Sequence, residues 1–139
     1  SNLNLVQMGY RCPDAKVIGT AVLNGYRLVF RGDRHTGVAT IEQERGSAVP
    51  VLLWEITKRC EQALDRYEGY PHLYRKEQLT VDLDGEKVHS MAYVMNEGPP
   101  PAMPGAYYYA TILHGYRDCG FDEKILKEAV MRTRGTGDD

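Results

Sequence analysis

The sequence predicts an α+β fold whose sheet is mostly antiparallel and can curve into a barrel. Strand candidates follow one another in a run, and helical patterns are interspersed singly between them. Two dipeptides typical of tight hairpins, Asn24-Gly25 and Asp84-Gly85, connect neighbouring strand candidates. A doubly wound fold would instead alternate strands and helices regularly, and the chain has no such alternation and no internal repeat.

Length and composition indicate one ordinary globular domain. The 139 residues are 42% hydrophobic and 26% charged, which leaves room for a single sizeable core. We expect this domain to span residues 1–131 and to be followed by a polar, glycine-rich tail over 132–139. The net charge of -2 argues against nucleic acid as a partner, because phosphate contacts need clustered positive charge.

Membrane and secretory signals are absent from the sequence as given. No apolar run approaches the length of a membrane span, and the first residues lack a charged-then-apolar pattern. The three cysteines, Cys12, Cys60 and Cys119, are odd in number, far apart and without a C-x-x-C motif. We therefore expect neither a disulfide framework nor a zinc site, but reduced thiols in a cytoplasmic protein with no membrane partner.

The first half of the chain is predicted to hold a brief helix and three strands. Asn4 is suited to cap the helix, and Asn24-Gly25 predicts a hairpin between the first two strands. A polar turn is expected over 44–47. The expected elements are a helix over 5–8 and strands over 15–22, 26–30 and 38–41.

The second half begins with an almost wholly apolar run over 49–56, which predicts a central strand buried on both faces. A helix follows, with Thr57 as its cap and Gly69 as its end. The proline-rich stretch over 97–105 cannot hold a strand ladder and is expected to lie on the surface. The other expected elements are strands over 74–83 and 87–95 and helices over 106–115, ended by Gly115, and 122–131, capped by Asp122.

Glu68 is the candidate for acid–base chemistry. It lies four residues after Leu64, on or beside the apolar stripe of the helix that Gly69 ends. Partial burial and the negative end of the helix dipole would both raise its pKa, as general acid–base catalysis near neutral pH requires. The alternative is that Glu68 extends into water or pairs with Arg66 or Arg75. The stripe that this argument uses consists of Cys60, Ala63, Leu64 and Tyr67.

Motifs for other chemistries are missing. No glycine-rich phosphate loop is present, the four histidines share no metal-ligand spacing, and no serine or cysteine nucleophile signature occurs. Glu68 and the ten tyrosines are the polar candidates that are left. The tyrosines either belong to a tyrosine-rich core or line a pocket for a polar small molecule. No metal or cofactor is expected.

Several short stretches occur together and in a fixed order, and in this combination the chain resembles the γ-glutamylcyclotransferase family, with its avirulence-induced-gene-like fold. The resemblance covers roughly residues 1 to 120. Ser1-Asn2-Leu3-Asn4 is similar to the end of the Tyr-Gly-Ser-Asn-Leu-Asn loop that opens the family. The other matching stretches are Arg11-Cys12-Pro13, Asn24 to Phe30, Val49 to Ile56, Leu64-Asp65 through Glu68-Gly69 to Tyr74-Arg75, and Ala92-Tyr93-Val94-Met95 with the proline loop and helix after it.

This resemblance implies a small mixed barrel with flanking helices and a cyclisation that needs no cofactor. The α-amino group of a γ-glutamyl substrate attacks its own γ-carbonyl, which releases an amine or amino acid and leaves 5-oxoproline. Glu68 matches the catalytic glutamate, Tyr74 and Tyr108 match tyrosines of the substrate pocket, and the opening loop supplies backbone N–H groups to the substrate. The residues of that loop are Ser1, Asn2 and Leu3.

Three expectations accompany the resemblance. The family has a strand and Tyr-Gly ahead of the serine, so we expect upstream residues to complete the loop. The Asn-Leu-Asn form is more similar to the enzymes for γ-glutamyl amino acids than to the glutathione-specific group, although the sequence does not choose the leaving group. A non-catalytic small-molecule or protein-binding module on the same fold is the alternative function. The sequence gives no expectation for the oligomeric state.

Overall fold

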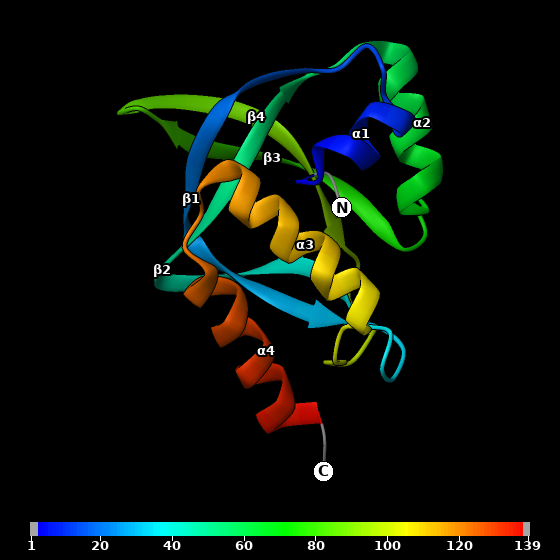
Figure 1. Ribbon diagram of the computed structural model, residues 1–139, viewed down its shortest axis with the longest axis vertical. Coiled ribbons are helices and arrows are strands. Elements are labelled where there is room, and N and C mark those ends of the chain that lie inside the picture. Colours follow the sequence, from blue (N-terminus) through cyan, green and yellow to red (C-terminus); the bar gives the residue numbers. More distant parts are fainter. Residues whose placement is uncertain (1–2, 138–139) are drawn as a thin grey trace.

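The structure, a computed structural model, describes residues 3–137. This part of the chain forms a single antiparallel sheet and four flanking helices (Figure 1). The strand order is β2-β1-β3-β4, so β2 and β4 are the edges of the sheet as described. The elements are α1 (Leu5–Arg11), β1 (Lys16–Arg31), β2 (Val38–Glu55), α2 (Lys58–Glu68), β3 (Tyr74–Leu83), β4 (Glu86–Met95), α3 (Ala106–Cys119) and α4 (Glu123–Gly137). This confirms the α+β class; the sheet is strongly curved but stays open between β2 and β4.

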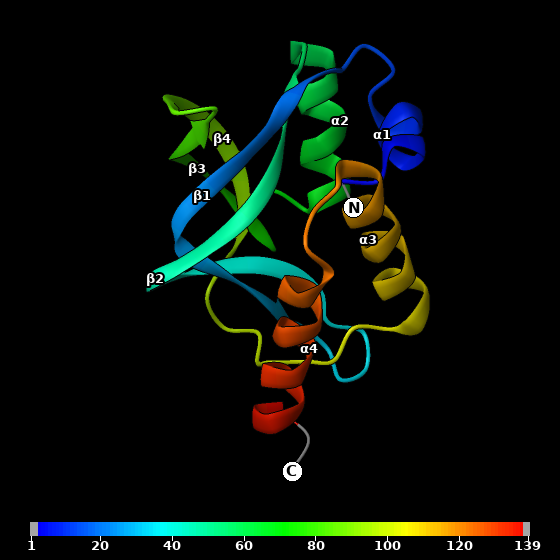
Figure 2. The ribbon, with the colours of Figure 1, turned by 60° about the vertical axis from the view of Figure 1, so that its left-hand side comes forward.

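The predicted hairpin at Asn24-Gly25 is wrong, because β1 continues through it without ending. The partners of β1 in β2 jump from Ala48 opposite Asn24 to Gln43 opposite Tyr26. Gly25 (φ 84°) therefore lies at a bulge, and residues 44–47, the predicted turn, lie opposite it inside β2. Both strands bend at this place, which gives one pair of long curved strands where we expected separate short ones (Figure 2).

The prediction of a central strand over 49–56 is also wrong. This part of β2 lies at the edge of the sheet and pairs only with β1 within the described residues. Val49 and Leu53 are buried, whereas Val51, Leu52 and Trp54 are only partly buried. The run is apolar because its side chains pack into the core clusters and border an internal cavity.

Two neighbouring core clusters and a smaller third one hold the elements together. The first packs α3 and α4 against β1 and β2 around Phe30, Tyr116 and Leu126, which are at most 1% exposed. The second joins β1, β2 and β3 through Leu23, Leu53, Leu79 and neighbours. The third joins α1 to α2 through Met8, Cys12, Cys60 and Leu64.

Cys12 and Cys60 form a disulfide between the end of α1 and the first turn of α2, with 5.0 Å between their Cα atoms. The expectation that these two thiols are reduced is therefore wrong, whereas Cys119 is free. The two cysteines are 48 residues apart in sequence, so spacing alone could not reveal that α1 and α2 bring them together. The bond ties α1 to the helix that ends at Glu68.

The two C-terminal helices are longer than predicted. α3 continues past Gly115 and ends at Gly120, which adopts the left-handed conformation (φ 72°). α4 continues through 132–137, where we predicted a polar tail; Thr133 is only 5% exposed, and Arg132 donates a hydrogen bond of 2.7 Å to the carbonyl of Leu28. Buried contacts to β1 thus extend the helix beyond residue 131, while the extent of the domain stays a prediction.

The proline-rich stretch over 97–105 lies largely at the surface, as expected, and is also attached to the sheet. Isolated bridges join Pro101 to Arg31 and Pro104 to Gly37, and the N–H of Ala102 donates to the carbonyl of Phe30 at 3.1 Å. Ala102 is buried. This strap leads the chain from β4 to α3 across the end of β1.

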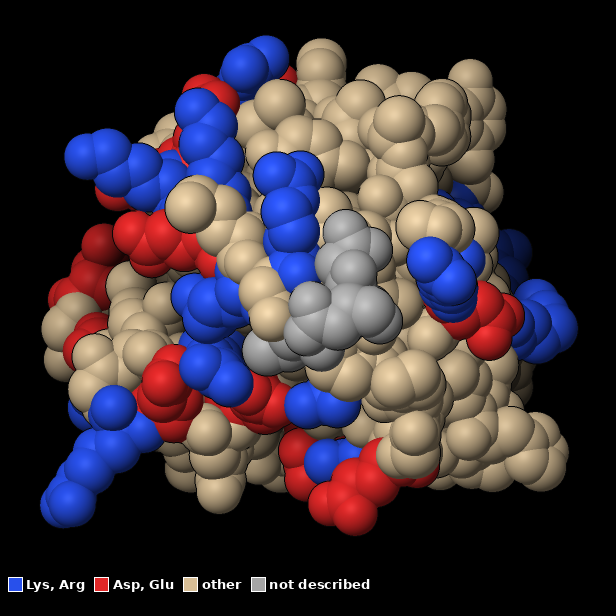
Figure 3. Space-filling view, turned by 90° about the horizontal axis from the view of Figure 1, so that it is seen from below, with Lys and Arg blue, Asp and Glu red and all other residues tan. Residues whose placement is uncertain are grey.

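The outer surface carries charges of both signs. Figure 3 shows basic and acidic side chains interspersed on one face, next to a broad uncharged area. Arg31 pairs with Glu42 at 2.6 Å, and Arg117 pairs with Glu123 at 3.1 Å. Among the described residues, no helix has the length and apolar character needed to cross a bilayer.

The predicted ends of α2 are confirmed. The N–H of Cys60 donates to Oγ1 of Thr57 at 3.1 Å, and Gly69 adopts the left-handed conformation with φ 68° and ψ 34°. The N–H of Tyr70 then donates to the carbonyl of Asp65 at 2.9 Å, which closes the helix. The position of Glu68, the last helical residue, is therefore determined by local sequence signals.

We predict that Gly69→Ala lowers the free energy of unfolding by about 1–2 kcal/mol, because a Cβ is disfavoured in the left-handed conformation. The added Cβ would also meet the Cβ of Leu73 at 3.4 Å. Chemical denaturation measures the change. The control is Gly9→Ala in α1, where the φ is ordinary and no atom lies within 4 Å of the new Cβ. Equal stability of the two variants would contradict the prediction.

Candidate active site

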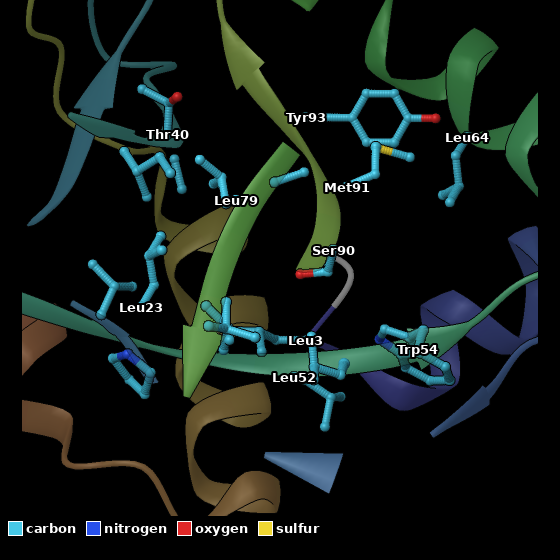
Figure 4. A pocket seen from close by; sticks show the side chains of 18 of the residues that line it. Leu3, Leu23, Thr40, Leu52, Trp54, Leu64, Leu79, Ser90, Met91 and Tyr93 are labelled. Carbon is cyan, nitrogen blue, oxygen red and sulfur yellow. The ribbon is translucent and has the colours of Figure 1, made fainter. Parts of the chain in front are cut away.

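A cavity of about 730 Å³ lies inside the curve of the sheet and is bordered by α2 and α3 (Figure 4). Strands β2 and β4 line it with the consecutive residues 49–54 and 88–93. Successive side chains of a strand point to opposite faces of the sheet. Because consecutive residues of β2 and of β4 line the cavity, the cavity follows the open edges of both strands. In Figure 4, Leu52 and Trp54 on one side and Ser90, Met91 and Tyr93 on the other surround this opening.

The wall of the cavity is mostly apolar. Among its described lining residues, Glu68 is the single carboxylate, and no lysine or arginine is present. The other polar groups are hydroxyls, one imidazole and one indole, contributed by Thr40, Tyr67, Tyr74, His89, Ser90, Tyr93, Tyr108, Tyr116 and Trp54. A carboxylate in such surroundings has few charged groups to stabilise its ionised form.

Glu68 is half-buried at the C-terminus of α2. Burial raises the pKa of its carboxyl above the ordinary value of 4.5, and the guanidinium of Arg11 opposes this rise only in part. Within residues 3–137 Glu68 forms no ion pair with Arg66 or Arg75. The guanidinium of Arg75 instead lies 3.4 Å (Nε to Oε1) from the carboxylate of Glu77 and donates a hydrogen bond to the carbonyl of Met95. The geometry favours the interpretation in which Glu68 faces the cavity.

Tyr74 and Tyr108 are anchored to the same residue of β2. The hydroxyl of Tyr74 donates to the carbonyl of Ala39 at 3.0 Å, and the N–H of Ala39 donates to the hydroxyl of Tyr108 at 2.9 Å. Burial raises the pKa of both phenols, that of Tyr108 to about 12, and the negative charge of Glu68 adds to the effect. Both tyrosines therefore line the cavity as neutral groups with fixed rings.

Leu3 enters the same cavity from the N-terminal segment. It packs against α3 at Gly115, where no side chain intervenes. Of the six residues proposed from sequence, the structure thus brings Leu3, Glu68, Tyr74 and Tyr108 to one cavity; Ser1 and Asn2 lie outside the described residues.

Sequence reasoning missed Tyr93 and Asp65 as neighbours of this site. Tyr93 lines the cavity, and its hydroxyl donates to Oδ1 of Asp65, one turn before Glu68 on α2. Burial by itself would raise the pKa of Asp65, but hydrogen bonds from Tyr93 and Lys76 hold it below the ordinary value. The signal that could have found Asp65 is its spacing of three residues from Glu68, which places both carboxylates on neighbouring parts of one helix.

The sequence matches one known family over most of its length. Residues 3–110 match the family described as "Gamma-glutamyl cyclotransferase, AIG2-like", which is well over half of the chain. The chain therefore belongs to this family, whose members act on small γ-glutamyl molecules. No curated protein matches the sequence.

Solved structures show the same fold. A gamma-glutamyl cyclotransferase is 25% identical with a TM-score of 0.82, and the match covers 92% of this chain and 80% of that one. An uncharacterized protein from Homo sapiens, loc79017, gives the same values. YkqA from Bacillus subtilis is 19% identical with a TM-score of 0.75 over 94% of this chain and 48% of its own, which supports the fold alone.

We predict that Tyr74→Phe and Tyr108→Phe each lower the free energy of unfolding by about 1 kcal/mol, because each leaves one backbone group of Ala39 without its partner. Denaturant titration at neutral pH measures this. The matched control is Tyr107→Phe, on the same helix as Tyr108. Tyr107 is 80% exposed, so the free energy of unfolding should change by no more than about 0.5 kcal/mol. Losses no larger than that of the control would contradict the anchoring role of Ala39.

Proposed function

We propose that this protein is a γ-glutamyl cyclotransferase that converts a γ-glutamyl amide into 5-oxoproline and a free amine or amino acid. The observation that carries the proposal is Glu68, the single carboxylate among the described residues that line an otherwise largely apolar cavity. Membership of the family supports the class of reaction, and the surroundings of Glu68 support its role.

The reaction is an intramolecular acyl transfer. The α-amino nitrogen of the substrate attacks the γ-carbonyl carbon, a new C–N bond closes a five-membered ring, and the original γ C–N bond breaks. One proton leaves the attacking nitrogen and one is delivered to the departing nitrogen, so no water is consumed and no oxidation occurs. A single carboxyl group can take the first proton and return it in the second step.

The raised pKa of Glu68 suits this exchange of protons. An ordinary glutamate is a weak base, whereas a carboxylate in apolar surroundings binds a proton more strongly and still releases it near neutral pH. Half-burial keeps the group in contact with the cavity and limits competition by water. Asp65 is unsuited to the role, because Tyr93 and Lys76 hold it ionised.

The remaining groups would bind and fold the substrate. Tyr74 and Tyr108 form a neutral wall that can pack against the bent glutamyl chain, which must adopt a near-attack conformation before the ring closes. Backbone N–H groups of Ser1, Asn2 and Leu3 are proposed to bind the substrate carboxylate and the developing oxyanion. A site that recognises mainly the glutamyl part leaves the identity of the departing amine open to variation.

We predict that Glu68→Gln lowers kcat/KM by about 10²–10⁴-fold, the usual contribution of a general acid–base group. Release of 5-oxoproline from γ-glutamyl amino acids, γ-glutamylamines and glutathione, followed by chromatography, measures the activity. Activity should also fall as the pH is lowered through the pKa of Glu68, with a midpoint above 4.5, because only the ionised carboxylate accepts a proton.

The matched control is Glu128→Gln, which removes an exposed carboxylate on α4 away from the cavity and should leave kcat/KM unchanged. Circular dichroism should show that both variants are folded. Full activity of Glu68→Gln would refute the mechanism. Tight binding of γ-glutamyl compounds in calorimetry without any 5-oxoproline would favour a non-catalytic binding module instead.

A further inference from the structure

Gly115 occupies an unexpected place in α3. It is buried inside the helix, which runs from Ala106 to Cys119 and ends at Gly120, so Gly115 does not serve as the helix end. Glycine inside a helix costs about 1 kcal/mol relative to alanine. A buried interior glycine therefore calls for a neighbour that leaves no room for a side chain.

That neighbour is the main chain of Leu3. A Cβ added at Gly115 would lie 2.7 Å from the Cβ of Leu3 and 3.0 Å from both its carbonyl carbon and its carbonyl oxygen. The tip of a flexible side chain could swing away from such a contact. Backbone atoms cannot, so any residue larger than glycine at position 115 must displace the N-terminal segment or the helix.

The contact lies on the face of α3 that borders the cavity. Tyr108, Ile112 and Gly115 follow one another at spacings of four and three residues, which places them on one side of a helix. Tyr108 and Ile112 line the cavity together with Leu3. Gly115 thus extends the cavity-facing stripe of α3 to the point where the N-terminal segment crosses it.

We propose that Gly115 is a positioning residue for substrate binding: its missing side chain lets the main chain of Leu3 lie directly on α3 and thereby fixes the place of Leu3 at the cavity. This inference rests on the proposed function, in which the N-terminal loop binds the carboxylate and the developing oxyanion. Gly115 acts through its contact with Leu3 and takes no part in proton transfer. Glu68 is on a different helix, α2.

A displaced loop should weaken binding and slow the reaction together. A misplacement of about 1 Å can cost up to about 10²-fold in rate, and loss of carboxylate contacts raises KM. We expect Gly115→Ala to lower kcat/KM by about 10- to 100-fold, mainly through KM.

The matched control is Gly9→Ala. It is the same substitution inside a helix, but nothing lies within 4 Å of the new Cβ, so kcat/KM should stay within about twofold of the wild type. An activity-independent readout is the amide resonance of Leu3 in NMR spectra, which should shift in Gly115→Ala and stay in place in Gly9→Ala. Wild-type KM together with an unshifted Leu3 amide in Gly115→Ala would overturn the proposal.

A second variant covers the case in which Gly115→Ala folds poorly. Leu3→Gly combined with Gly115→Ala removes the 2.7 Å contact and should recover part of the folded population and of KM. If the double variant fails to fold as well, Gly115 acts in core packing alone and the proposal is overturned. If the wild type releases no 5-oxoproline, the proposed function fails, and the role of Gly115 in substrate binding fails with it. Wild-type KM together with an unshifted Leu3 amide in Gly115→Ala refutes only the positioning role.

Discussion

The half-buried position of Glu68 at the end of α2 is the constraint on which the site depends. Thr57 and Gly69 fix where α2 begins and ends, and Cys60 and Leu64 bury the helix against α1. The disulfide between Cys12 and Cys60 adds a covalent tie between the two helices. Each of these features keeps one carboxylate at the wall of an apolar cavity, where burial raises its pKa.

Two carboxylates on the same helix show how surroundings divide their roles. Asp65 accepts hydrogen bonds from Tyr93 and Lys76 and stays ionised, whereas Glu68, one turn later, has no such partners among the described residues. Opposite pKa shifts of two neighbouring carboxyl groups are typical of sites in which one group stays charged and the other transfers a proton. Tyr93 links the two, because it binds Asp65 and also lines the cavity.

Local signals predicted the parts of the fold that depend on few residues. The caps of α2, the turn at Asp84-Gly85 and the placement of Glu68 follow from neighbouring residues, and all three occur. Asn24-Gly25 carries the same kind of signal, yet long-range pairing with β2 turned it into a bulge. The disulfide and the contact between Gly115 and Leu3 join segments far apart in sequence, so no local pattern could reveal them.

The pKa of Glu68 tests the central claim most directly. Carbon-detected NMR of the side-chain carboxyl, assigned by its loss in Glu68→Gln, follows the titration of this single group. Because burial disfavours the charged form, the protein should hold the proton to higher pH, with a midpoint above 4.5. A midpoint at or below 4.5 would show that Glu68 is solvated or paired, and would contradict its role as the proton-transfer group.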